Sequence, residues 1–417
     1  MANDWRQRPL GELTENFDNI RVPVKEADRR AGSYPYYGAS GIVDYVDGYL
    51  FDGEYLLIAE DGENLRTRTT PVAFLARGKF WVNNHAHIVR GNSEADTRFL
   101  MYALANTDIS GYLTGSTLPK LTQGNLNRIL VPAPLVPEQR AVASVLSTLD
   151  DKIELNSQMT ETLQGMARAL FKSWFVDFDP ARAKTEKRDP GIPKRIAELY
   201  PSSFEESELG SIPTGWRTGS FGDVVEHLRE QENPLSSPET IFHHYSIPAF
   251  DSAHWAKAEV GSNIKSLKSR VPPNVILLSK LNPEIERVWL VDVQPDERAI
   301  CSTEFLVLNP RPPFGRAYAY CLARSSTFRQ QIEALVTGTS KSHQRAQVDS
   351  VLQMPVVLPP ASIVQEFETY SSMLLARTQS CRRESRTLGA MRETLLPRLI
   401  SGEVRISFPE RIVGGRA

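Results

Sequence analysis

One segment of the sequence comes close to a catalytic motif of methyltransferases that act on base amino groups: Asn309-Pro310-Arg311-Pro312-Pro313-Phe314. Those enzymes place Asn, Asp or Ser before Pro-Pro and an aromatic residue, so that a polar group accepts the target amine and the ring stacks on the base. Here Arg311 stands where the acceptor must be, and no glycine-rich cofactor loop precedes the segment at the end of a strand. We therefore expect this segment to form a turn.

A nuclease core and a nucleotide-driven motor are not expected either. Restriction nucleases hold magnesium with an acidic residue and Glu/Asp-x-Lys, because carboxylate oxygens are ligands that Mg²⁺ prefers. The sequence has no Glu-x-Lys, and Asp150-Asp151-Lys152, which fits the pattern, lies in a predicted helix as a solvated charged face. The chain also lacks Gly-x4-Gly-Lys-Ser/Thr, the motif of a P-loop.

His85 and His87 have the spacing of metal ligands on one face of a strand. No cysteine lies near them, and the sequence offers no third ligand. A structural role, or a role facing a nucleic acid, is therefore the better interpretation of both histidines.

Other side chains are of the types that contact nucleic acid. Lys, Arg and small hydroxyl groups bind phosphates, while Asn, Gln, Arg and His bind base edges. The loops after Gly115-Ser116-Thr117 and Gly338-Thr339-Ser340 are rich in these types, the second loop more than the first. The candidate contacts are Thr117, Lys120, Gln123, Lys280, Lys341, His343, Gln344 and Arg345, and the alternative for each is a solvated surface role. Tyr36 and Tyr37 could stack on bases or could belong to the core.

Composition limits the class of protein. The 417 residues suffice for two or three domains, and three scattered cysteines favour a reducing compartment over a disulfide framework or a zinc cluster. The sequence begins without an apolar signal core and has no apolar run of the ~20 residues that a membrane helix needs, so we expect a cytoplasmic protein. A net charge of −2 neither indicates nor excludes nucleic acid, because a local basic face is enough.

The elements that must position these residues are duplicated along the chain. Trp5-Arg6 with residues 10–13 recurs as Trp216-Arg217 with residues 221–224, and the Gly-Ser/Thr blocks and a helical Thr-Leu…Met…Leu pattern recur in the same order. Such a repeat predicts two similar domains, each followed by a similar helix. The interiors differ: residues 58–62 have no sequence counterpart in Ser279-Lys280-Leu281-Asn282-Pro283. One scaffold carrying two different recognition surfaces would give this pattern.

Each predicted domain is α+β. Strands are expected at residues 55–59, 72–76 and 87–89 of the first and at 275–278, 288–291 and 305–308 of the second, because these runs are apolar and β-branched and are bounded by turn residues. Short helices are expected at residues 98–104 and 316–322.

Two long helices follow the domains, and each carries a heptad seam of alternating three- and four-residue spacing. Neither helix can bury its seam alone, so we expect the two helices to pack as an antiparallel coiled coil. The seams are polar at mid-length, at Asn156, Thr160, Arg377 and Glu384, which either fix the register or reach solvent. The predicted apolar contacts between the helices are Leu146, Leu149, Ile153, Leu163, Leu170, Leu374, Leu388, Met391 and Leu395.

The predicted boundaries follow from these patterns. Residues 1–137 form the first domain, 138–176 the first long helix, 177–215 a proline-rich linker, 216–362 the second domain, 363–401 the second long helix and 402–417 a loose tail. We expect the linker to return along the first helix before the second domain starts.

The chain resembles the specificity subunit of type I restriction-modification enzymes over nearly its whole length. Residues 34–42, 51–55 and 83–87 look like one class of target recognition domain, and residues 279–283 with 302–305 look like another. Residues 396–404, Leu-Pro-Arg-Leu-Ile-Ser-Gly-Glu-Val, resemble the end of the family's second conserved helix.

The resemblance implies a DNA-reading subunit without chemistry of its own. Each domain would read one half of an asymmetric double-stranded target, and the helices would space the domains and dock two methyltransferase subunits, through which motor-nuclease subunits join. S-adenosylmethionine, ATP and magnesium would belong to those partners, with no cofactor or metal on this chain and no membrane involved. A stand-alone binding module that pairs with a protein remains the alternative, whereas a fused methyltransferase-nuclease fails on length and motifs.

Overall fold

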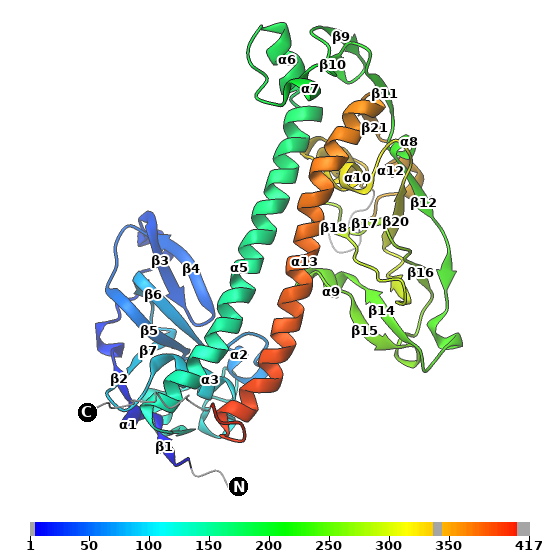
Figure 1. Cartoon of the computed structure of the whole chain (residues 1–417). Helices are drawn as coiled ribbons and strands as arrows, with labels where there is room; N and C mark the ends of the chain where they lie inside the picture. The colour runs from blue at the N-terminus through cyan, green and yellow to red at the C-terminus, as the bar shows by residue number, and fades with distance from the viewer. Residues whose placement is uncertain (1–4, 337–343, 407–417) are drawn as a thin grey trace, which may run out of the picture. The chain divides into compact units, whose positions relative to one another are not determined.

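The computed structural model describes residues 5–336 and 344–406. Contacts divide the chain into two compact units, Met1–Leu155 with Glu384–Ala417, and Asn156–Arg383. Each unit therefore holds one β-rich body and part of both long helices, α5 (Val136–Phe175) and α13 (Ala361–Ile400), which Figure 1 traces through the chain. No helix among the described residues is long and apolar enough to cross a membrane.

The body of the first unit is a twisted sheet with the strand order β2-β7-β5-β6-β3-β4. Its central strand is buried on both faces, since Leu56 and Ile58 face one apolar cluster and Leu57 faces another. The three strands predicted from the apolar runs lie at its centre. The strands are β2 (Thr14–Asn16), β3 (Ala31–Gly38), β4 (Gly41–Val46), β5 (Phe51–Ala59), β6 (Ala73–Val82) and β7 (Ala86–Gly91).

The body of the second unit divides the same arrangement between two sheets, of order β12-β20-β17-β18 and β13-β16-β19-β14-β15. The first comprises β12 (Val225–Leu228), β17 (Ile276–Ser279), β18 (Val288–Leu290) and β20 (Phe305–Pro310). The second comprises β13 (Gln231–Glu232), β14 (Ile241–Tyr245), β15 (Lys257–Val260), β16 (Lys268–Arg270) and β19 (Ala299–Cys301). The apolar run at residues 275–278 forms the central strand β17, as predicted.

Backbone pairing confirms the duplication. Leu10 N–H donates to Ile129 O in the first unit, and Phe221 N–H donates to Met354 O in the second, both at 2.8 Å. These bonds extend the strand pair β1 (Gln7–Pro9) with β8 (Leu130–Pro132), and the pair β11 (Arg217–Ser220) with β21 (Pro355–Leu358). The helices also correspond: α1 (Leu10–Leu13) with α8 (Phe221–Val224), α3 (Thr97–Ala105) with α10 (Arg316–Ala323), and α4 (Gln123–Arg128) with α12 (Val348–Leu352).

The proline-rich segment after α5 is folded. It forms α6 (Asp179–Thr185), α7 (Lys194–Ala197) and a hairpin of β9 (Phe204–Ser207) with β10 (Gly210–Pro213). Ile196, Tyr200 and Ile212 are buried in the core of the second unit. Trp216 packs on Phe175 with ring centroids 6.0 Å apart, so the second domain starts where α5 ends. The prediction that this segment returns along the helix is wrong, because its apolar side chains anchor it at the end of α5.

The two long helices, 40 residues each, pack antiparallel, as predicted. In the first unit Arg392 Nη1 lies 2.8 Å from Asp150 Oδ1. In the second unit Cys381 Sγ lies 3.4 Å from Met159 Sδ. Residue numbers therefore rise along one helix where they fall along the other, as in an antiparallel pair.

The structure places the predicted seam residues at different depths. Leu146 is fully buried, Leu395 packs on the core of the first unit, and Leu170 and Leu374 pack on the core of the second. The remaining leucine and isoleucine positions, Leu149, Ile153, Leu163 and Leu388, are partly buried.

Two positions of the predicted seam of α13, Met391 and Arg377, are exposed. Met391 is 47% exposed and Arg377 is exposed, whereas Thr378 and Ser371 are fully buried. A small hydroxyl side chain permits a close helix approach, and Thr378 Oγ1 satisfies itself by donating to Leu374 O at 3.1 Å. The predicted seam passed over these small hydroxyl residues and therefore included Arg377, the exposed neighbour of Thr378. Of the polar mid-seam residues, Asn156 is buried, while Thr160 and Glu384 are partly buried.

Candidate nucleic-acid interface

The loop that leaves the central strand of the first sheet is bonded to the loop that carries Lys120. Gly62 N–H donates to Pro119 O at 3.1 Å, and Leu121 N–H donates to Glu60 O at 2.7 Å. Asp61 and Lys120 form an antiparallel bridge between these bonds. We call residues 60–62 with residues 119–121 the first junction.

The second unit repeats this arrangement bond for bond. Asn282 N–H donates to Gln344 O at 2.8 Å, and Ala346 N–H donates to Lys280 O at 2.9 Å. Leu281 and Arg345 form the bridge between them. We call residues 280–282 with residues 344–346 the second junction. The two segments without sequence similarity after β5 and β17 are thus structurally equivalent.

Both junctions have positive φ at one equivalent position. Gly62 has φ +115° and Asn282 has φ +48°. Glycine adopts positive φ without steric cost, and asparagine is among the residues that tolerate the left-handed helical region.

The side chains at two of the three equivalent positions differ in charge. Glu60 in the first junction corresponds to Lys280 in the second, and Lys120 corresponds to Arg345. A third position follows from the bonds of Glu60 N–H to His85 O and of Lys280 N–H to Glu304 O, both 2.9 Å long. The same backbone frame thus presents Glu, His and Lys in one unit and Lys, Glu and Arg in the other.

A buried ionic network holds the first junction. Arg21 Nη1 donates to Glu60 Oε2 at 2.8 Å, and Lys120 Nζ lies 3.3 Å from Glu60 Oε1. Burial raises the pKa of Glu60, but the hydrogen bond from Arg21 and the nearby positive charges outweigh it and lower the pKa overall. Glu60 therefore stays ionised and fixes the position of Lys120.

His87, in β7, links the loop at Leu121 to the first sheet. Its Nδ1 lies 2.6 Å from Asp18 Oδ2, and its Nε2 lies 2.8 Å from Leu121 O. Each ring nitrogen thus faces an oxygen that can accept a hydrogen bond. His85, in contrast, is exposed and bonds to Asp61 at 2.9 Å. The structural interpretation of His87 is thus supported by its contacts.

An ion pair holds the second junction. Arg345 Nη2 lies 2.9 Å from Glu304 Oε1, and Arg345 Nε lies 3.0 Å from Glu304 Oε2. The hydrogen bond from Arg345 lowers the pKa of Glu304, although partial burial opposes this. The Arg345 side chain remains 44% exposed.

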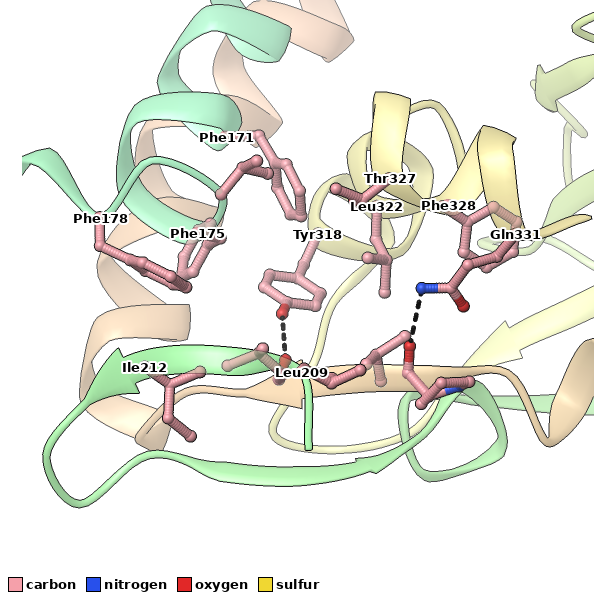
Figure 2. Close-up of a pocket in the computed structure, with 14 residues that line it drawn as sticks. Phe171, Phe175, Phe178, Leu209, Ile212, Tyr318, Leu322, Thr327, Phe328 and Gln331 are labelled. Atoms are coloured by element: carbon pink, nitrogen blue, oxygen red, sulfur yellow. Dashed lines mark hydrogen bonds between the residues drawn. The ribbon is translucent and has the colours of Figure 1, made fainter. Parts of the chain in front are cut away.

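A pocket elsewhere in the second unit has a different character. Figure 2 shows this cavity of about 180 Å³, with Phe171, Phe175 and Phe178 on one side and Leu322 and Phe328 on another. Its polar groups bond to backbone, since Tyr318 Oη donates to Val357 O at 3.4 Å and Gln331 Nε2 donates to Pro355 O at 3.3 Å. The residues that line it are uncharged, so it offers no cation to a phosphate.

Known proteins are similar to the first domain and to nearly the whole chain. The family model described as the type I restriction modification DNA specificity domain matches residues 2–164. The MjaIX specificity subunit of Methanocaldococcus jannaschii is 22% identical over 97% of this chain and 95% of its own. The HindI specificity subunit of Haemophilus influenzae is 24% identical over 96% of this chain and 100% of its own.

The chain is thus similar over nearly its whole length to specificity subunits of type I restriction enzymes. A further Haemophilus influenzae specificity subunit, S.HindORF215P, is 40% identical over 147 residues, which cover 35% of this chain and 37% of that relative. The crystal structure of the S subunit from M. genitalium has the same fold, with a TM-score of 0.62, 14% identity and coverage of 95% and 96% of the two chains.

The predicted contact residues of this chain fall into three groups. Lys120 lies in the first junction, and Lys280, Gln344 and Arg345 lie in the second. Thr117 and Gln123 are exposed on either side of the first junction, and no described residue ties them to it through their side chains. Lys341 and His343 lie outside the described residues.

Sequence reasoning missed the carboxylates that hold the basic residues. Glu60 and Glu304 precede or follow a strand far from Lys120 and Arg345 in the sequence, so only strand pairing brings them together. The sequence carries one signal for these two carboxylates: each acidic residue borders an apolar run predicted as a strand. Of the two tyrosines, Tyr36 is buried and belongs to the core, and Tyr37 packs on Phe80.

The apparent catalytic motifs have structural roles. Phe314 N–H donates to Arg311 O at 2.9 Å, so the Asn-Pro-Arg-Pro-Pro-Phe segment forms the expected turn between β20 and α10. Asp150 accepts hydrogen bonds from Tyr102 Oη and Arg392, and Lys152 lies 3.5 Å from Glu384. Within residues 5–336 and 344–406, no group of three or more His, Cys, Asp and Glu could hold a metal.

Proposed function

We propose that each unit reads one half of a bipartite, asymmetric double-stranded DNA target. The equivalence of the two junctions carries this proposal: one backbone frame presents two different sets of charged side chains, as two half-site readers on a shared scaffold would require. Lys and Arg on such loops supply the phosphate and base contacts that DNA recognition needs. The similarity of the chain to two specificity subunits over nearly its whole length supports this role.

In this proposal α5 and α13 separate the two readers and dock two methyltransferase subunits. Motor-nuclease subunits join through the methyltransferases, and those partners bind S-adenosylmethionine, ATP and magnesium. We expect the complex to act on double-stranded DNA in the cytoplasm. The chain purified alone should show only background methylation of DNA with S-adenosylmethionine and magnesium.

A domain exchange tests the proposal directly. Residues 35–128 are replaced by the equivalent residues of a relative with a known target, and the complex with methyltransferase subunits is reconstituted. Mapping methylated positions should show a new sequence in one half of the target and the original sequence in the other. A reciprocal exchange within residues 228–347 is the matched control and should alter only the other half. A change in both halves from one exchange would contradict independent reading.

A further inference from the structure

The most defined donor in either junction is the guanidinium of Arg345. Its backbone is fixed on both sides, because Gln344 O accepts from Asn282 N–H and Ala346 N–H donates to Lys280 O. Its side chain is fixed as well, because Nε and Nη2 donate to both carboxylate oxygens of Glu304. Position and plane of the guanidinium are therefore set before any ligand binds.

The ion pair uses only one edge of the guanidinium. Nε and one hydrogen of Nη2 face Glu304, which leaves Nη1 and the second hydrogen of Nη2 as a pair of parallel donors. No described residue accepts a hydrogen bond from Nη1. Because 44% of the Arg345 side chain is exposed, this free edge is accessible.

The charge of Glu304 decides what that edge can bind. Arg345 and Glu304 together are neutral, and a phosphate approaching the arginine would also meet the carboxylate. The neutral acceptors N7 and O6 of guanine match two parallel N–H donors in spacing and carry no such repulsion. Lys120, at the equivalent position of the first junction, has a compact ammonium group without a planar fork, so it lacks this fixed pair of parallel donors.

We propose that Arg345, held by Glu304, reads a guanine in the major groove of the half-site recognised by the second unit. Glu304 is a positioning residue: it orients the guanidinium and neutralises its attraction for phosphates. The inference rests on the proposed function, since it assigns one specificity-determining contact within the half-site of the second unit.

The test uses the chain assembled with its methyltransferase subunits and a duplex whose target is known from the methylation pattern. Each guanine of the second half-site is replaced in turn by 7-deazaguanine, which lacks the N7 acceptor. At one position the wild-type complex should lose affinity by roughly tenfold or more, as expected for the loss of a paired arginine contact. Arg345→Ala, which has no donor, should bind the natural duplex correspondingly less tightly and should not respond to 7-deazaguanine at that position.

Salt dependence separates base reading from phosphate binding. Arg345→Ala combined with Glu304→Ala removes the neutral pair without changing net charge. This double variant should leave the slope of log affinity against log salt unchanged, whereas loss of a phosphate contact lowers it by about one. Glu304→Gln alone should reduce the 7-deazaguanine effect and steepen the slope, because the released arginine is then free to bind phosphate. Arg311→Ala combined with Glu226→Ala is the matched control, since these residues form a solvent-exposed pair and their removal should leave both readouts unchanged.

Two results overturn the inference while leaving the proposed function intact. One is a second half-site in which no guanine responds to 7-deazaguanine in the wild-type complex. The other is an Arg345→Ala complex that responds as the wild type does, which makes Arg345 a purely structural partner of Glu304. A complex that recognises no split target at all would instead overturn the proposed function.

Discussion

At the residue scale, the backbone at Gly62 and Asn282 determines how each junction leaves its central strand. Gly62 has φ +115°, which lies outside the left-handed helical region that asparagine tolerates at Asn282. An added side chain at residue 62 meets nothing within 4 Å, so any cost of substitution comes from the backbone and not from a clash.

The first prediction concerns this glycine. Gly62→Ala should lower the free energy of unfolding of the first unit by about 1–3 kcal/mol, the usual cost of a disfavoured backbone conformation. Gly124→Ala is the control, because Gly124 lies in α4 with open space around it and alanine should stabilise the helix by roughly 0.5–1 kcal/mol. Urea unfolding of both variants measures the difference. Equal shifts of the same sign would contradict the backbone argument.

Acid sensitivity is a second property of single residues. Burial raises the pKa of Asp18, but hydrogen bonds from His87 and from the Ile88 N–H outweigh it and hold the pKa below its usual value. A carboxylate whose folded-state pKa is lowered adds stability above its unfolded pKa of about 3.9. That stability is lost as the pH falls from this value through the folded-state pKa.

The second prediction follows from the lowered pKa of Asp18. Asp18→Asn should destabilise the first unit by about 1–3 kcal/mol near neutral pH, because it removes the ionised partner of buried groups. The stability gap to the wild type should narrow below about pH 4. Thermal unfolding between pH 3 and pH 7 measures this gap, with the exposed Asp151→Asn as control. A gap that stays constant down to pH 3 would mean that Asp18 contributes through shape alone.

Sequence reasoning at this scale identified the basic residues and missed their partners. Lys120 and Arg345 stand in loops of suitable composition, which a sequence shows directly. Their carboxylates, Glu60 and Glu304, reach them only through sheet pairing, and that depends on register between distant strands. The sequence likewise does not show that Glu60 and Lys280, which have opposite charges, occupy equivalent positions, because that equivalence also depends on strand pairing.

At the element scale, the long helices show what a heptad pattern can and cannot determine. Their existence, length and antiparallel pairing follow from a sustained apolar period. The inner face of α13 does not follow, because Ser371 and Thr378 occupy buried positions that an apolar count passes over. Close packing selects side chains by size as well as by polarity.

The third prediction uses the corrected seam. Leu146→Ala should lower the free energy of unfolding of the first unit by about 2–5 kcal/mol, because Leu146 is fully buried and its removal leaves a cavity. Met391→Ala should change it by less than about 0.5 kcal/mol, because 47% of Met391 is exposed. Urea unfolding followed by far-ultraviolet circular dichroism measures both. Comparable losses would place Met391 in the seam after all.

At the scale of the whole molecule, the duplicated chain could be predicted because its frame residues recur. Trp5 and Trp216, and the turns at residues 10–13 and 221–224, mark the same strand pairs in both units. The fold of residues 177–215 could not be predicted, because prolines exclude a long helix without indicating where Tyr200 and Ile212 become buried. Composition alone therefore describes that segment as a linker, and burial makes it part of the second unit.

The last prediction concerns the distance between the two half-sites. Helix α5 has 40 residues, and at about 1.5 Å per residue it is about 60 Å long. One turn of B-DNA spans roughly 34–36 Å, so readers separated by such a helix should leave unread base pairs between the half-sites. Inserting four residues after Leu155, which is 49% exposed, adds about 6 Å and should lengthen the unread spacer by one or two base pairs.

Methylation mapping of the reconstituted complex measures that spacer. Both half-site sequences should persist, while the disturbed seam should weaken stability and methyltransferase docking. The same four residues inserted after Lys187, in the turn that follows α6, form the control and should leave the spacer unchanged. If the Leu155 variant folds and methylates DNA with the original spacer, the helices do not set the distance, and the spacing must come from the methyltransferase subunits instead.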